Sequence, residues 1–151
     1  QAVSAQIEAN ALPFSTVELN GGHHLWPEVG KYGEIASFYH EWAIDKPGMK
    51  DIPAKVVHST NLGGHQWLSE YVYDTSGQLC FAKLKEVKGK NVIERRFFYR
   101  DGWPIGVMEG SVYQDGISPE QTQRADSMLA QAVRLLQVEM AMSTIPSDPL
   151  E

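Results

Sequence analysis

Histidine is the residue type in this chain with the most versatile chemistry, and five are present. His23 and His65 each follow a Gly-Gly pair, and His24 is next to His23. Imidazole nitrogens bind Zn²⁺, so these three are candidate metal ligands, with Glu28 or Asp51 as an oxygen ligand. The spacing contains neither H-x-H nor H-E-x-x-H, and adjacent residues of an extended chain point to opposite sides. The sequence therefore favours polar loop residues over a metal site, and we expect no cofactor.

Two further histidines are predicted to lie on strands. His40 shares its predicted strand face with Phe38 and Trp42, an arrangement typical of a hydrogen-bonded core or cavity residue. It could act as a general base beside a carboxylate, but Glu41 must point to the opposite face. His58 could pair with His40 if their strands are neighbours. The pattern favours a structural role, and a small hydrolase or metal-dependent enzyme that uses clustered histidines is the alternative.

Nucleophile and phosphate-binding signatures are missing from the sequence. No G-x-S-x-G occurs, and neither Gly-Gly pair continues into a Lys-Ser or Lys-Thr phosphate loop. Cys80 lies between Leu79 and Phe81, where we expect a small buried hydrophobic residue and not a thiolate. The sequence gives catalysis no support, so a non-enzymatic function is favoured.

Composition indicates a globular protein of one domain, which we place at residues 1–149. Residues 150–151 have the form of a cloning remnant. The formal net charge is −6, which argues against a general affinity for nucleic acid. No apolar run approaches the roughly 20 residues that span a bilayer, so we expect no transmembrane segment. A first residue other than Met fits an exported protein and also a trimmed cytosolic domain, and a single cysteine does not decide between them. We expect a periplasmic or secreted protein.

The elements that must position these residues are clearest in residues 66–113, which predict a β-meander. Asp74-Thr75-Ser76-Gly77 suits a three-residue hairpin loop, Lys88-Gly89-Lys90 offers a second, and Asp101-Gly102 is the two-residue type I′ signal. These turns set Tyr71 opposite Phe81, Phe81 opposite Phe97, and Phe98 opposite Ile105.

That register predicts two apolar faces. One carries Tyr71, Tyr73, Leu79, Phe81, Ile93, Phe97 and Tyr99, with Lys83, Lys85 and Arg95 toward one end. The other carries Leu68, Val72, Cys80, Ala82, Leu84, Val92, Phe98, Ile105 and Val107. An antiparallel sheet with one solvated face normally alternates apolar and polar residues, so either both faces are covered or one binds something. The aromatic face is the candidate ligand-binding surface, and a second interpretation makes it the main core. Its candidate residues are Tyr71, Tyr73, Phe81, Phe97, Tyr99, His40 and Trp42.

A basic cluster at one end of the meander contrasts with the acidic whole. Its members are Lys83, Lys85, Lys88, Lys90, Arg95 and Arg96. Solubilising charge that protects strand edges explains such a cluster, and a docking patch for an acidic partner or an anionic headgroup is the alternative.

A long helix is predicted over residues 118–142. Ser118 and Gln121 form a capping box, with Pro119 at the first helical position. An apolar stripe follows at 3.6-residue spacing and predicts packing on the sheet. Its members are Ala125, Met128, Leu129, Ala132, Leu135, Leu136 and Met140. Upstream we expect a short helix over 2–12, a strand over 14–19, a loop over 20–33, and strands over 34–44 and 54–60.

Residues 73–79 and 99–105 share an aromatic–turn–Gly–x–aliphatic pattern. In this pattern the chain resembles exported bacterial β-meander accessory proteins of lipoprotein-like type. The resemblance covers residues 70–109 and departs from the usual pattern at Trp103-Pro104. It implies a scaffold and an extracytoplasmic location, and nothing about a ligand.

Together these features predict an α+β fold, with a twisted antiparallel meander of five to seven strands and one long C-terminal helix on one face. The function expected is an exported binding module that recognises a protein or an apolar small molecule through the aromatic sheet face. A periplasmic inhibitor or immunity-type protein is one such module, and a homodimer through that face is a further expectation. A lipid or cofactor carrier with an enclosed cavity is a second alternative.

Overall fold

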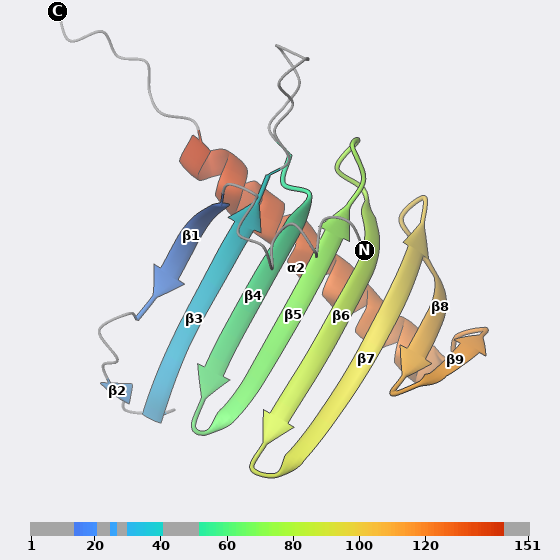
Figure 1. Cartoon of the computed structure of the whole chain (residues 1–151), viewed down its shortest axis with the longest axis horizontal. Helices are drawn as coiled ribbons and strands as arrows, with labels where there is room; N and C mark the ends of the chain where they lie inside the picture. Colours follow the sequence, from blue (N-terminus) through green and yellow to red (C-terminus); the bar gives the residue numbers. More distant parts are fainter. Residues whose placement is uncertain (1–13, 21–24, 27–29, 41–51, 144–151) are drawn as a thin grey trace, which may run out of the picture.

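One wide antiparallel sheet and one long helix form the architecture of this computed structural model (Figure 1). The structure describes residues 14–20, 25–26, 30–40 and 52–143. The elements in chain order are β1 (Phe14–Leu19), β2 (Leu25–Trp26), β3 (Gly30–Tyr39), β4 (Lys55–Leu62), β5 (His65–Tyr73), β6 (Leu79–Lys88), β7 (Asn91–Arg100), β8 (Trp103–Glu109), β9 (Val112–Asp115) and α2 (Pro119–Ser143).

The predicted α+β class is confirmed. The strand order is β1-β3-β4-β5-β6-β7-β8-β9, with β2 paired to β3, and all pairs are antiparallel. The described residues form more strands than the five to seven expected, because the expected loop over 20–33 contains β2 and because β9 follows the predicted hairpins. The expected helix over 2–12 and Trp42 lie outside the described residues.

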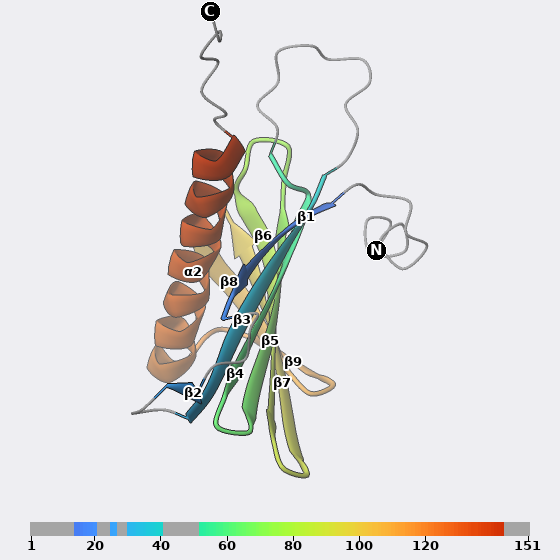
Figure 2. The same ribbon diagram turned by 90° about the vertical axis from the view of Figure 1, so that its left-hand side faces the viewer.

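Helix α2 crosses one face of the sheet diagonally (Figures 1 and 2). The tyrosine-rich side of the sheet lies beneath this helix. Of the two interpretations of that side, the main core is the one that the structure shows. The buried cluster consists of Ala36, Phe38, Val56, Tyr71, Tyr73, Leu79, Ala82, Phe97, Tyr99, Val107, Ala125, Met128, Ala132 and Leu135. We call the opposite side of the sheet the open face. No helix among the described residues lies over it (Figure 2).

Two of the three hairpin turns have the predicted geometry. In the β5–β6 turn, Asp74 Oδ1 accepts hydrogen bonds from the main-chain nitrogens of Ser76 and Gln78, and Gly77 has the left-handed φ of 84°. In the β7–β8 turn, Asp101 and Gly102 both have positive φ, as a type I′ turn requires.

The predicted register was wrong beyond these turns. The β6–β7 turn has two central residues, Gly89 and Lys90, because Lys88 faces Asn91. A β-bulge between β5 and β6 sets Tyr71 opposite Ala82, and a second irregularity sets Phe98 opposite Gly106. Phe81, Lys83 and Lys85 consequently lie on the open face, whereas Ala82, Leu84 and Val107 lie beneath α2.

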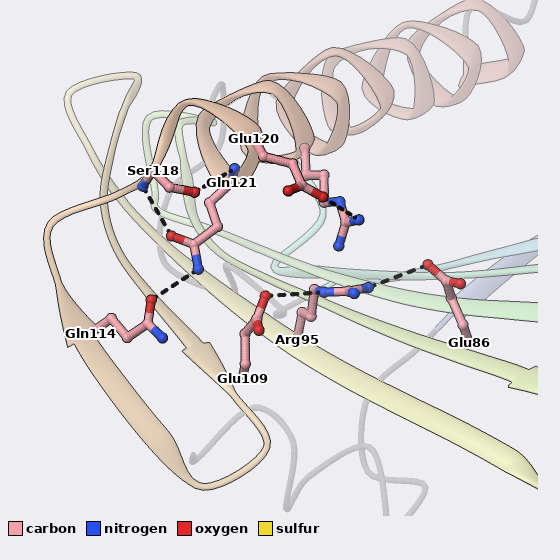
Figure 3. Close-up of polar contacts among 8 residues, drawn as sticks. Glu86, Arg95, Glu109, Gln114, Ser118, Glu120 and Gln121 are labelled. Atoms are coloured by element: carbon pink, nitrogen blue, oxygen red, sulfur yellow. Dashed lines mark hydrogen bonds and ion pairs between the residues drawn. The ribbon is translucent and has the colours of Figure 1, made fainter.

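The start of α2 is fixed by the predicted capping box (Figure 3). The Ser118 hydroxyl accepts a hydrogen bond of 3.2 Å from the Gln121 main-chain nitrogen, and the Gln121 side chain accepts one of 3.0 Å from the Ser118 nitrogen. The expected stripe holds except at its end, where Met140 is 53% exposed and Glu139 is buried instead.

Candidate functional site: the open face of the sheet

The structure divides the candidate ligand-binding aromatics between two locations. Tyr71, Tyr73, Phe97 and Tyr99 are buried beneath α2, so they form no exposed surface. Burial raises the pKa of Tyr71 to about 12, and it raises the pKa of Tyr73 and Tyr99 as well. Phe81 is half-buried on the open face, because the bulge reverses its orientation.

The buried histidine on β4 has a partner at each ring nitrogen. His58 Nε2 is 2.5 Å from Glu34 Oε1, and His58 Nδ1 is 3.2 Å from Gln131 Nε2 on α2. The Tyr32 hydroxyl donates a hydrogen bond to the other Glu34 oxygen. With both nitrogens occupied and 5% of the residue exposed, His58 is arranged to join β3, β4 and α2, not to transfer a proton to a ligand.

The other described histidines are separate from His58. His40 Nε2 lies 2.7 Å from Glu139 Oε1 of α2. His65 stacks on Trp67 with ring centroids 3.7 Å apart, and its Nε2 lies 3.8 Å from Glu86. The structure thus brings each of the three to a different glutamate.

A metal centre gains no support from this arrangement. Within the described ranges, no three histidine, cysteine or acidic side chains are close enough to hold a metal ion. His23, His24 and Trp42 lie outside those ranges. The expectation for Cys80 was wrong, because the bulge leaves this thiol exposed.

One apolar cavity lined by described residues is small. It has a volume of about 220 Å³ and lies between α2 and the β5–β6 and β7–β8 turns, where Tyr73, Leu79, Leu129, Val133 and Leu136 line it. Sites for drug-sized ligands usually have ~300 Å³ or more and enclose most of the ligand. This cavity is smaller than such a site, so it lends the carrier alternative no support.

An apolar band crosses the open face. Cross-strand pairing places Val72, Phe81 and Phe98 in one row, and all three are half-buried. The rings of Phe81 and Phe98 have centroids 5.5 Å apart, and Tyr113 contacts Phe98 edge-on at 5.9 Å. A solvated sheet face normally carries polar residues at such positions, whereas this band is apolar.

Tyr113 lies over Gly106, the glycine that pairs with Phe98 in that row. A Cβ added to Gly106 would lie 2.5 Å from the Tyr113 hydroxyl oxygen, so glycine permits this close contact. Tyr113 is nevertheless 52% exposed. It therefore extends the aromatic band from β7 to β9, and an exposed tyrosine is a residue type favoured at recognition surfaces.

Charged side chains of both signs border this band. Glu70 accepts from Lys55 at 2.9 Å and from Lys83 at 3.3 Å. Burial by itself would raise the pKa of Glu70, but the two ammonium groups outweigh it and the pKa lies below its usual value. Arg96 pairs with Glu94 at 2.6 Å and its guanidinium also contacts Met108. The rim charges are thus held in place on the sheet.

Sequence reasoning missed Val72, Phe98 and Tyr113 as members of a candidate site. The predicted register assigned Val72 and Phe98 to the second, largely aliphatic face, which was not the candidate binding surface. Tyr113 carried no signal beyond its position at the end of the meander. The turn residues give no sign of the β-bulge at Cys80, the extra residue that moves the Phe81 side chain to the other face.

Comparison with family models, curated proteins and solved structures found no match for this chain. Among the described residues, no helix is long and apolar enough to cross a membrane. The candidate site therefore has to be argued from its own geometry.

Proposed function

We propose that this protein is a non-enzymatic binding module that recognises a protein partner through the open face of its sheet. The observation that carries the proposal is the contrast between the two faces. Helix α2 buries the apolar residues of one face, whereas the open face keeps Val72, Phe81, Phe98 and Tyr113 partly exposed in one band. An exposed apolar patch bordered by polar residues is typical of an interaction site.

The shape of this surface favours a protein over a small molecule. Strands β4–β8 lie about 4.8 Å apart and rise about 3.4 Å per residue, which gives a surface on the order of 600 Å² for about seven residues of each strand. One side of a standard protein interface buries about 800 Å². Aromatic residues at its centre, with methionine and arginine beside them, match the composition of interface cores.

The exported location expected from the sequence stays part of this proposal. An inhibitor or immunity-type protein that covers a partner's surface fits a flat recognition face. The enzymatic alternative is weakened because both ring nitrogens of His58 are engaged within the fold.

Site-specific photo-cross-linking in cells tests the proposal. A photoreactive phenylalanine analogue replaces Phe81, Phe98 or Tyr113 on the open face, and Val133, an exposed residue of α2 away from the open face, in the control. We expect a discrete heavier species from the open-face positions alone. Equal products from the Val133 position, or none from any position, would contradict the proposed surface.

The identity of that species separates a foreign partner from a second copy of the chain. Mass spectrometry of the cross-linked band reports which it is, and sedimentation of the purified protein gives its oligomeric state. A dimer lost on Phe98→Asp but not on Val133→Asp would replace the foreign partner by the homodimer that the sequence also suggested.

A further inference from the structure

The β6–β7 hairpin extends past α2 and past the neighbouring β4–β5 hairpin (Figures 1 and 2). Its turn consists of Gly89 and Lys90, and its last strand residues are Lys88 and Asn91. Gly89 has a φ of +60°, which suits the first central position of a type II′ turn. The end of this ribbon therefore protrudes and closes in a tight two-residue turn.

Cations concentrate at the hairpin end in a protein whose net charge is −6. Lys85, Lys88 and Lys90 form no ion pair within the described part of the chain. The nearby acidic residues are compensated, since Glu86 lies 3.5 Å from Arg95 and Glu94 lies 2.6 Å from Arg96. The positive potential at the turn is thus not cancelled by its own surroundings.

Exposed aliphatic side chains accompany these cations on both sides of the ribbon. Val92 points to the open face and is 56% exposed, and Ile93 points to the side of α2 and is 46% exposed. A rigid protein surface would cover one side of a two-stranded ribbon. A lipid headgroup layer surrounds whatever enters it, so apolar side chains on both sides can be buried together.

We propose that the β6–β7 hairpin docks this protein on an anionic lipid surface. The ammonium groups of Lys85, Lys88 and Lys90 would neutralise lipid phosphates while Val92 and Ile93 enter the headgroup region. Each lysine near an anionic surface contributes about a factor of five to binding. The attachment is peripheral and reversible, and it does not use the apolar band of Val72, Phe81, Phe98 and Tyr113.

The test uses the full chain and vesicles of phosphatidylcholine with or without phosphatidylglycerol. We expect co-sedimentation with the phosphatidylglycerol vesicles alone, and a loss of binding at high salt because the Debye length shortens. Lys88→Ala with Lys90→Ala should weaken binding about thirty-fold. The matched control, Arg100→Ala with Arg134→Ala, removes the same charge from exposed positions elsewhere and should leave binding unchanged.

A fluorescence measurement reports where the chain meets the vesicle. In a Cys80→Ser background, Val92→Cys labelled with an environment-sensitive dye should shift its emission to the blue on vesicle binding. The same dye at Val133→Cys on α2 should not shift.

Several results would overturn the proposal. The first is binding to neutral vesicles that equals binding to phosphatidylglycerol vesicles. The second is a loss of binding in the arginine control equal to that in the lysine variant. The third is a dye shift at Val133 alone. Failure to bind vesicles, together with lysine-dependent binding to polyglutamate, would replace the lipid by an acidic polypeptide. None of these outcomes bears on the open face, because no protein partner is present in the assay.

Discussion

The hydroxyl of Tyr73 donates a hydrogen bond of 2.9 Å to the main-chain carbonyl oxygen of Ala132. Tyr99 makes the equivalent bond of 2.7 Å to Ala125, seven residues earlier on α2. Seven residues are about two helical turns, so the two phenols bind successive turns of the same side of the helix. Together they fix the position of α2 along the sheet.

Tyr73→Phe and Tyr99→Phe should each lower the free energy of unfolding by about 1 kcal/mol. The loss stays moderate because each helix carbonyl keeps its intrahelical hydrogen bond when the phenol is removed. Urea denaturation of both variants measures it. Tyr113→Phe is the control, and its exposed phenol should change the stability by less than about 0.5 kcal/mol. An equal effect at all three positions would contradict the assigned role of the buried pair.

The buried phenols also predict a loss of stability in alkali. Burial raises the pKa of Tyr71 to about 12 from an ordinary value of 10.0, and it raises the pKa of Tyr73 too. The folded state therefore favours the protonated phenols, and their contribution is fully present below pH 10 and is lost as the pH rises above it. The part of the tyrosinate absorbance that comes from the buried phenols should appear together with the change in circular dichroism, above pH 10. Ionisation of all six tyrosines of the chain near pH 10 in a folded protein would contradict this prediction.

Features determined by a few neighbouring residues could be predicted from the sequence. The Asp101-Gly102 turn follows from the two positive φ angles that a type I′ turn demands. The start of α2 follows from the reciprocal hydrogen bonds that Ser118 and Gln121 can make. The α+β class follows because the apolar stripe of this helix must pack on something, and the meander is the large partner that the sequence predicts.

Features determined across strands could not be predicted in the same way. One extra residue at Cys80 reverses Phe81, and no local turn chemistry announces such a bulge. The pairing of His58 with Glu34 and Gln131 joins three elements that are remote in sequence. The predicted site therefore wrongly included tyrosines that are buried in the core, and it left out Phe98 and Tyr113.

The lowered pKa of Glu34 leads us to expect a loss of stability in acid. Burial by itself would raise the pKa of this carboxyl, but hydrogen bonds from Tyr32 and His58 outweigh it and place the pKa below its usual value of 4.5. A lowered folded-state pKa gives a contribution that is present above pH 4.5 and is lost as the pH falls through the folded-state value.

Glu34→Gln should therefore flatten the decline of the urea midpoint below pH 4.5. It should also lower the midpoint at neutral pH, because the amide cannot replace the carboxylate beside His58. Glu18→Gln, at an exposed position of β1, is the matched control. A slope identical to that of the wild type would show that Glu34 is not the group responsible.

Phe97 and Phe98 offer a paired test of the two faces, because they are adjacent, identical in type and point to opposite sides of β7. Phe97 is fully buried beneath α2, whereas Phe98 is half-buried on the open face. Phe97→Ala should cost about 3–5 kcal/mol of stability, since it leaves a cavity in the core. Phe98→Ala should cost far less, because water already reaches part of that ring.

For binding of the partner, we expect the Phe98 substitution to have the larger direct effect. Phe98→Ala removes the central ring of the apolar band between Phe81 and Tyr113, so it should weaken partner binding at least ten-fold while the fold remains intact. Denaturation and cross-linking yield, measured on the same pair of variants, separate the two effects. If Phe98→Ala proved as destabilising as Phe97→Ala, the open face would be a second core, and its exposed band could not be assigned to a partner.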